Sequence, residues 1–209
     1  QHSEKIKGHS SVRGFEKPLL EWCTHVHPLV PLLLWSPIVF LCLRSGVVDS
    51  QLSASEWSWL FVAAFFSWTF TEYFLHRVVF HFPAKSRAGK YFVYLFHGLH
   101  HDDPDDASRL VMPPVPAILI MGLLTLFFGL FFSPRYLSSF MGFFIIGYLF
   151  YDYIHYGTHH FKMKNPLARY LKKFHLQHHH SKEAAKYGVS SPIWDIILGT
   201  MTGPKKDRK

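Results

Sequence analysis

The stretch from Tyr136 to His159, YLSSFMGFFIIGYLFYDYIHYGTH, passes from an apolar segment straight into a pair of histidines. Its apolar part, about 136–156, has roughly the 20 residues that an α-helix needs to cross the hydrocarbon core of a bilayer. His155 and His159 are spaced i, i+4, so a helix presents both side chains on one face. The stretch therefore predicts a membrane helix that carries two imidazoles to one membrane surface.

Three other apolar runs of similar length lie at about 29–48, 57–80 and 115–132. Pro37 is expected to kink the first run, and Pro113–Pro114 precedes the third, with Pro116 in its first turn. Only Ser133–Pro134–Arg135 separates the third and fourth runs, which predicts a tight helical hairpin. The expected fold is an all-α integral membrane protein with four transmembrane helices, in which residues 1–28 form an N-terminal segment and residues 29–209 form the membrane domain.

The composition agrees with contact between the chain and lipid. Of the 209 residues, 49% are hydrophobic and 17% are charged, whereas soluble domains are about 25% charged. A soluble protein with buried helices is the alternative, but the length of the runs and the 21 phenylalanines favour a membrane. Two cysteines, Cys23 and Cys42, are too few for a disulfide framework.

The net charge of +8 is distributed as a topology signal. Lys and Arg flank the apolar runs and form no basic face interleaved with aromatic residues, so no nucleic-acid partner is expected. Residues 49–56 contain neither Lys nor Arg, whereas the N-terminal segment, the loop after the second run and the tail are basic. The positive-inside rule then places both termini and the middle loop in the cytoplasm. The membrane would be the endoplasmic reticulum in a eukaryote or the inner membrane in a bacterium.

Ten of the sixteen histidines fall into four clusters at the cytoplasmic ends of these runs. Neutral imidazole is a ligand for first-row metals, and ten nitrogens suffice for two metals with about five each. The sequence therefore predicts a cytoplasmic helical cap that holds a histidine-rich dimetal site. The ten candidate ligands are His76, His81, His97, His100, His101, His155, His159, His175, His178 and His179.

Helical geometry predicts how the clusters are presented. Each H-x2-H-H cluster should lie on one helix face, whereas His76 and His81 would be about 140° apart on a straight helix. That helix is therefore expected to end or unwind between them, before Phe82–Pro83. The other six histidines lie off these faces or match no cluster: His2, His9, His25, His27, His160 and His180.

The helix of the last cluster has recognisable signals. Asn165 is a plausible N-cap and Pro166 suits the first helical position. An apolar stripe is expected to turn His175 and His178 inward. The stripe consists of Leu167, Tyr170, Leu171 and Phe174.

The identity of the metal is left open by the ligands. Imidazole accepts zinc, copper, iron or nickel, and zinc binds such ligands more tightly than ferrous iron. Two metals next to a membrane suit oxygen chemistry on an apolar substrate, so a purified sample could hold zinc where the working protein holds iron. A structural zinc site or a pH-sensing histidine interface is the alternative.

The clusters and their neighbours resemble the fatty acid hydroxylase superfamily, and in particular the fatty acid 2-hydroxylases that act on sphingolipids. The resemblance covers about 57–203. It rests on the histidine boxes, on the segment RLVMPP at 109–114, and on Gly188–Val189–Ser190 with Trp194–Asp195. Sterol desaturase-like and carotenoid hydroxylase-like proteins share the boxes, so the last two segments favour the 2-hydroxylases.

This resemblance implies a two-iron, O2-dependent monooxygenase that hydroxylates C2 of a fatty acyl chain, either the N-acyl chain of a sphingolipid or a free fatty acid. No catalytic residue beyond the metal ligands is expected. Eukaryotic 2-hydroxylases usually carry a cytochrome b5-like haem domain, which residues 1–28 do not resemble. Electrons are therefore expected from a separate donor such as cytochrome b5 or ferredoxin, unless the chain is a piece of a longer one.

Four charged residues are candidates for roles around the metals or the substrate. Asp152 lies on roughly the same helix face as His155, and Glu72 and Asp195 match positions of the resembled family. Each of the three would either orient a ligand or be a solvated acid or helix cap. Arg109 would either bind a lipid headgroup or pair with the aspartates at 102, 103, 105 and 106.

Other functions compete with this one. The same centre could hydroxylate or desaturate a sterol or a carotenoid. A zinc-dependent membrane hydrolase is less favoured because H-E-x-x-H is absent. A metal transporter is disfavoured because the histidines gather at one membrane face and leave no path across it. The sequence assigns no oligomeric state.

Overall fold

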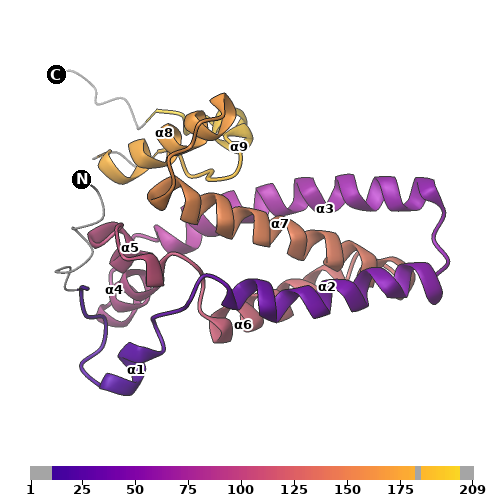
Figure 1. Cartoon of the computed structure of the whole chain (residues 1–209), viewed down its shortest axis with the longest axis horizontal. Coiled ribbons are helices and arrows are strands. Elements are labelled where there is room, and N and C mark those ends of the chain that lie inside the picture. The colour runs from indigo at the N-terminus through magenta and orange to yellow at the C-terminus, as the bar shows by residue number, and fades with distance from the viewer. Residues whose placement is uncertain (1–10, 182–184, 203–209) are drawn as a thin grey trace.

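Four long helices form a bundle, and short helices gather at one end of it as a cap (Figure 1). The computed structural model describes residues 11–181 and 185–202, and these residues form helices and loops without a β-strand. The predicted all-α fold is therefore confirmed. The bundle consists of α2 (Val30–Val48), α3 (Ala54–Phe74), α6 (Pro114–Phe128) and α7 (Pro134–His160).

Local sequence signals set the ends of these helices. At the start of α3, Ser53 Oγ accepts from the Glu56 amide at 3.4 Å while the Glu56 carboxylate accepts from the Ser53 amide at 2.7 Å, which makes a capping box. The predicted hairpin is present, but its turn spans residues 129–133. Pro134 and Arg135 already belong to the first turn of α7, because a proline is well suited to the first helical position.

Three helical segments of the described chain are long and apolar enough to cross a membrane. They are Val30–Val48, Ala107–Phe128 and Pro134–His160. The predicted second span coincides with α3, which is 21 residues long but is not among them. Its serine, threonine and glutamate residues lower its mean hydropathy, so the fourth span is not confirmed.

Aromatic side chains fill the interior of the bundle, where α7 packs against both α2 and α3. The Trp68 ring of α3 lies 5.2 Å from Phe144 and 5.6 Å from Tyr148 of α7, measured between ring centroids. A methyl group on Gly147 would lie 2.7 Å from the Trp68 ring. The close approach of α3 and α7 therefore depends on the missing side chain of Gly147.

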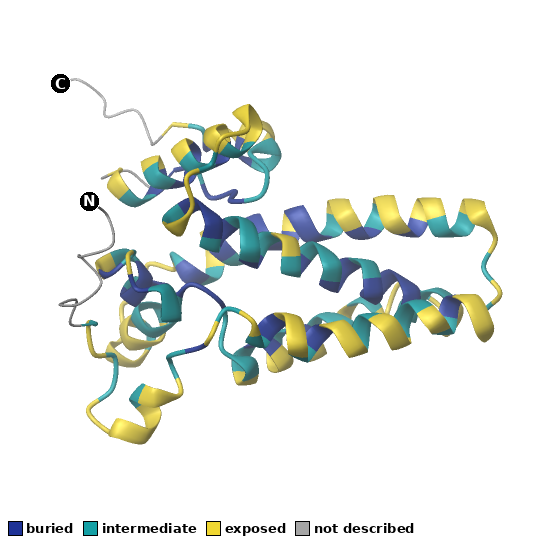
Figure 2. Cartoon of the chain, viewed as in Figure 1, coloured by how far each residue is buried: buried dark blue, intermediate teal, exposed yellow. Residues whose placement is uncertain are grey.

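The outward faces of the bundle are apolar. Leu33, Leu123 and Leu126 are 72%, 68% and 72% exposed, and Figure 2 shows exposed residues along the outer sides of the long helices. A contiguous exposed apolar surface of this kind marks contact with a membrane or a partner. Together with the three candidate spans, it indicates a membrane protein.

The cap is built from short helices at the end of the bundle where the described chain both begins and ends (Figure 1). Its α-helices are α1 (Pro18–Trp22), α4 (Arg87–Val93), α5 (Leu99–Asp102), α8 (Pro166–His180) and α9 (Ile193–Ile197). Two π-helical turns, η2 (Leu75–Phe80) and η3 (Tyr94–Gly98), and one 3-10 turn, η4 (Ala107–Arg109), connect them to the bundle.

Helix α8 begins as predicted, since Asn165 Oδ1 accepts from the Leu167 amide at 2.8 Å and Pro166 follows. The predicted stripe is only partly right. Leu171 and Phe174 are buried with His175 and His178, but Leu167 and Tyr170 are 66% and 45% exposed. Tyr170 lies about 140° around the helix from His175. Leu167 lies in the first turn, which is exposed.

Candidate metal centre

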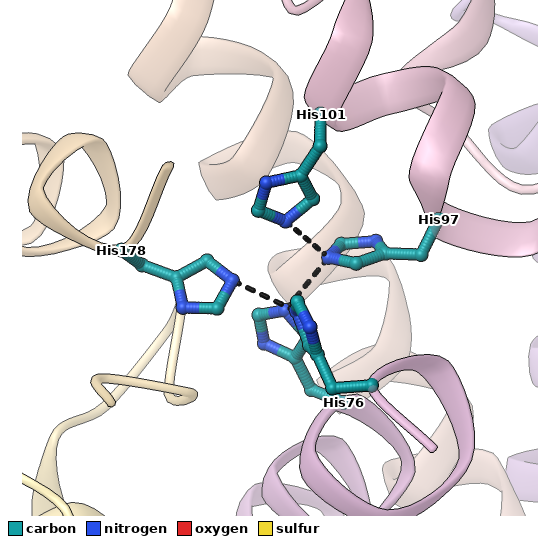
Figure 3. Close-up of side chains that lie close together, drawn as sticks. His76, His97, His101 and His178 are labelled. Atoms are coloured by element: carbon teal, nitrogen blue, oxygen red, sulfur yellow. Dashed lines mark hydrogen bonds between the residues drawn. The ribbon is translucent and has the colours of Figure 1, made fainter. Parts of the chain in front are cut away.

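The ten predicted histidines converge into two groups of five, and within each group one ring nitrogen per residue lies within 4.8 Å of the others. Figure 3 shows four rings of the first group pointing toward one another from different segments. The first group contains His76, His81, His97, His101 and His178. The second group contains His100, His155, His159, His175 and His179.

A π-helical turn brings His76 and His81 into the same group. Helix α3 does not unwind after Phe74; it widens into η2, where the His81 amide donates to the His76 carbonyl at 3.1 Å. The helix does end between the two histidines, at Phe80, as predicted. Because a π turn pairs residues i and i+5, it aligns two side chains that a straight α-helix would separate. Such turns are rare and often occur at functional sites.

Each H-x2-H-H box divides its three imidazoles between the two groups. His97 and His101 join the first group while His100 joins the second. In α8 the arrangement is reversed, because His175 and His179 join the second group while His178 joins the first. The i, i+4 pair of each box thus stays together, and the residue between its members crosses to the neighbouring group. The two groups therefore lie side by side and share both boxes.

The Nε2 atoms within each group are too close to be satisfied by hydrogen bonds alone. His97 Nε2 lies 2.8 Å from His76 Nε2 and 3.0 Å from His101 Nε2. His175 Nε2 likewise lies 2.8 Å from His159 Nε2 and 3.0 Å from His179 Nε2. One ring nitrogen carries either one hydrogen or one in-plane lone pair. A cation between the rings would satisfy all of these nitrogens at once, so both groups fit a metal ion.

Burial and mutual proximity favour the neutral form of these rings. Desolvation, followed by the neighbouring His178, lowers the pKa of His81 to about 4. Desolvation and the same neighbour lower the pKa of His101 to about 3, and burial lowers the pKa of His97, His100 and His175 as well. A neutral imidazole offers a lone pair to a metal, whereas a protonated one does not.

Backbone carbonyls orient two rings of the first group from behind. His178 Nδ1 lies 2.8 Å from the Ala185 carbonyl oxygen, and His76 Nδ1 contacts the Tyr187 carbonyl oxygen. A carbonyl only accepts, so both Nδ1 atoms carry the hydrogen and both Nε2 lone pairs face the centre of the group. Hydrogen bonds of this kind fix the tautomer and orientation of metal-ligating histidines.

Glu72 and Asp195 hold the segment that supplies these carbonyls, which we call the return loop (residues 185–190). Asp195 accepts from the amides of Tyr187 and Gly188 at 2.9 and 2.8 Å, and Glu72 accepts from those of Val189 and Ser190 at 2.6 and 2.8 Å. The two carboxylates therefore contact the loop and not the rings that the loop orients.

The second group has a different environment. The Nδ1 atoms of His100, His175 and His179 are buried without a hydrogen-bond partner among the described residues, whereas His155 has a backbone hydrogen bond to Leu110. His175 is 0% exposed, so close packing holds its ring.

The fatty acid hydroxylase family profile matches residues 61–200, which include all ten of these histidines. This chain belongs to the fatty acid hydroxylase family. The match also includes the return loop and Asp195, so the segment that orients the first group lies within the family domain.

Several characterised family members are similar to the chain over most of its length. A dihydroceramide fatty acyl 2-hydroxylase of Arabidopsis thaliana is 37% identical, over 85% of this chain and 74% of that protein. Human fatty acid 2-hydroxylase is 31% identical, and the chain spans 58% of its length. The solved hydroxylase domain of Scs7p superposes with a TM-score of 0.82 at 32% identity, over 90% of this chain and 71% of that one.

The remaining sequence candidates, Asp152 and Arg109, have no described hydrogen bond to a ring nitrogen of either histidine group. Asp152 accepts from the Tyr148 hydroxyl at 2.7 Å. Arg109 forms ion pairs with Glu21 and, at 3.4 Å, with Asp106. Of the two roles predicted for Arg109, pairing with an aspartate is observed for Asp106, and binding of a lipid headgroup stays a prediction.

An apolar cavity of about 880 Å³ leads to both groups of this hydroxylase. Its inner end is lined by His97 of the first group and by His100 and His155 of the second. Leu99, Val111, Met112 and Leu119 contribute to its apolar walls. Its volume lies within the range of pockets that enclose most of a small ligand.

Several residues around the site were not predicted from the sequence. The return-loop carbonyls of Ala185 and Tyr187 carry no side-chain signature, so only the folded chain reveals them. Glu21 and His25 lie far from the boxes in sequence, and both contact Arg109. Glu21 is one of three glutamates in the N-terminal segment, so its residue type alone did not single it out.

Proposed function

We propose that this chain is a membrane-bound hydroxylase that inserts one oxygen atom from O2 at C2 of a fatty acyl chain, in a sphingolipid or a free fatty acid. The observation that carries the proposal is the apolar cavity that ends at two adjacent groups of five histidines. The named activities of the relatives, dihydroceramide and ceramide fatty acyl hydroxylation among them, support the same reaction.

The proposed metals are two iron ions, one in each group, and the ten histidines are their proposed ligands. When bound, the iron pair supplies the activation of O2 with two electrons from a separate donor such as cytochrome b5 or ferredoxin. Zinc could replace iron in a purified sample, because zinc ranks above ferrous iron in affinity for nitrogen ligands.

The protein itself contributes ligation, orientation and exclusion of water. His76 Nδ1 and His178 Nδ1 keep their hydrogens on return-loop carbonyls, which leaves the Nε2 lone pairs for the metal. The apolar walls formed by Val111, Met112 and Leu119 would hold the acyl chain and keep water from the reacting carbon. We assign Glu72 and Asp195 the role of positioning the return loop, and Asp152 a place beside the acyl chain.

The proposed membrane topology has four transmembrane helices, namely the three candidate spans and α3, and it places the cap in the cytoplasm. Both described ends lie at the cap end of the bundle, which suits the cytoplasmic termini that the positive-inside rule predicts. In a eukaryote the membrane would be the endoplasmic reticulum, and in a bacterium the inner membrane.

Lipid mass spectrometry of cells that express the chain tests the function. We expect acyl lipids that are one oxygen heavier, with the hydroxyl group at C2, in cells with the wild type and with His180→Gln but not with His178→Gln. His180 is the matched control because it is exposed and its Nδ1 contacts the Leu176 carbonyl oxygen of its own helix at 2.7 Å. Hydroxylated sterol or carotenoid in place of hydroxylated acyl chains would overturn the substrate assignment. No oxygenated product despite bound iron and a supplied donor would overturn the hydroxylase itself.

A further inference from the structure

One wall of the cavity is formed by residues 11–27, which we call the N-terminal strap. This segment contains none of the ten clustered histidines. Hydrogen bonds join it to residues 106–108, which follow the histidine cluster at 97–101. The Val26 amide donates to the Ser108 carbonyl at 2.7 Å, and Ser11 Oγ donates to Asp106 at 2.6 Å. Figure 1 shows α1, within this strap, at the cap end of the bundle. The strap lines the cavity with Phe15, Leu20, Trp22, Thr24, His25 and Val26.

Arg109 lies where the strap meets this wall, and it has hydrogen-bonding capacity to spare. Its side chain is 4% exposed and it lines the cavity. Nη2 donates to Glu21 and to His25 Nε2, the latter at 3.0 Å, and Nε lies 3.4 Å from Asp106. Nη1 is buried without a hydrogen-bond partner among the described residues. A buried unsatisfied donor is costly, which indicates that a bound molecule completes this site.

The surroundings of Arg109 also define its charge. A guanidinium only donates, so His25 Nε2 accepts from it and His25 Nδ1 carries the hydrogen, which is directed at Ser108 Oγ 2.6 Å away. Burial opposes ionisation of Glu21, but hydrogen bonds from the Phe15 and Gly14 amides and the charge of Arg109 lower the pKa of Glu21 overall. One guanidinium therefore faces two carboxylates, Glu21 and Asp106, beside a neutral imidazole.

The excess of negative charge around Arg109 bears on which lipid headgroup can bind there. The carboxylate of a free fatty acid would add a third negative charge beside Glu21 and Asp106, and like charges in a buried site repel strongly. The amide or hydroxyl oxygen of an N-acyl lipid accepts a hydrogen bond and adds no charge.

We propose that Arg109, held by Glu21 and Asp106, is a headgroup subsite that takes an uncharged oxygen acceptor of an N-acyl sphingolipid, and that it selects such lipids over free fatty acids. The inference deepens the proposed function and rests on it for the identity of the lipid. Within this subsite, Glu21 is a positioning residue that also sets the local charge.

Competitive binding tests the subsite without turnover. A fluorescent ceramide is bound to the full chain in detergent and is displaced by unlabelled ceramide or by a fatty acid of the same acyl length. We expect the wild type to prefer ceramide by about tenfold or more, which is the order of one hydrogen bond to a charged group. Arg109→Gln should lose most of this preference through weaker ceramide binding. Arg169→Gln is the matched control because Arg169 is exposed on α8 and does not line the cavity.

Glu21→Gln provides an independent test, since it keeps the shape of the side chain and removes one negative charge. It should tighten fatty acid binding several-fold and leave ceramide binding nearly unchanged. Equal binding of the two lipids by the wild type would overturn the proposal, as would fatty acid binding that is unchanged in Glu21→Gln. This second variant decides the matter if Arg109→Gln does not fold.

The experiments distinguish a failure of the headgroup subsite from a failure of the proposed hydroxylase function. A preference for ceramide with the expected response of the variants, but without any hydroxylated product, would overturn the hydroxylase and leave the subsite standing. Hydroxylation of both lipids at C2 with no preference, in the wild type and in Arg109→Gln alike, would overturn the subsite and leave the hydroxylase standing.

Discussion

The two histidine groups present the same number of imidazoles, but they are held in different ways. In the first group, His76 and His178 donate from Nδ1 to carbonyls of the return loop, and two carboxylates hold that loop. In the second group, the Nδ1 atoms of His100, His175 and His179 have no partner in the described parts of the chain, whereas His155 has a backbone hydrogen bond to Leu110. The comparison indicates that hydrogen bonds to the return loop orient rings of the first group, whereas close packing holds most rings of the second group.

The largest loss of activity is expected from variants in which one of the two groups loses one histidine. His76→Gln and His155→Gln should each lower hydroxylase activity at least about a hundredfold and lower the bound metal from about two ions to about one, because both positions serve one reaction. Elemental analysis of the purified variants, together with product formation, measures both effects. His180→Gln should match the wild type. Full activity in either variant would show that its group is dispensable.

An intermediate effect is expected from the loop that distinguishes the groups. Asp195→Asn places an amide against the Gly188 amide and should loosen the return loop, with a loss of about 10–100-fold in the metal affinity of the first group. The second group should be unaffected. Metal retention during titration with a chelator measures this affinity.

Single-site backgrounds separate the two groups in that titration. In a His155→Gln background the metal of the first group is measured, and Asp195→Asn should weaken it. In a His76→Gln background the metal of the second group is measured, and Asp195→Asn should leave it unchanged. Asp105→Asn, at an exposed position, is the control. Equal weakening in both backgrounds would contradict the comparison.

The smallest effect is expected on the pH dependence of stability, because both groups contain histidines with lowered pKa values. Burial lowers the pKa of His81 to about 4 and that of His101 to about 3, and it lowers the pKa of His175 in the second group. Between about pH 6.5 and these lowered values, the unfolded chain binds protons that the folded metal-free chain does not bind. The stability of the metal-free protein should therefore fall as the pH is lowered from 7 to 5.

Thermal unfolding of the metal-free protein at pH 7 and pH 5 measures this loss as a lower Tm at pH 5. The metal-loaded protein at pH 7 should unfold at a higher temperature than either, because metal binding adds to the free energy of folding. A metal-free Tm that is the same at both pH values would show that the histidines are as easily protonated in the folded chain as in the unfolded one.

Local rules predicted the elements of the site well. The i, i+4 spacing of His155 and His159, the capping residues of α8 and the length of the apolar runs all follow from the geometry of one helix. The same rules were less successful where a neighbouring element decides the outcome. The helix was expected to end or unwind between His76 and His81, but the chain also widens into a π turn at Leu75–Phe80 that brings the two side chains together.

Non-local contacts were beyond those rules. Leu167 and Tyr170 were expected to face inward, but only Leu171 and Phe174 of the stripe are buried. Arg109 had two equally good roles in the sequence, and the ion pairs with Glu21 and Asp106 became visible only in the folded chain. Glu21 is 88 residues away from it along the chain, so no local pattern connects the two.

The sequence by itself determined the ten imidazoles, the helices that present them and the basic flanks that predict their side of the membrane, because these depend on residue type and on spacing within one segment. The tertiary structure alone decided which five histidines form each group, which backbone carbonyls orient them and what surrounds Arg109. These choices depend on the packing of segments that are distant along the chain. A carbonyl oxygen belongs to every residue, so its role becomes visible only where the fold places it.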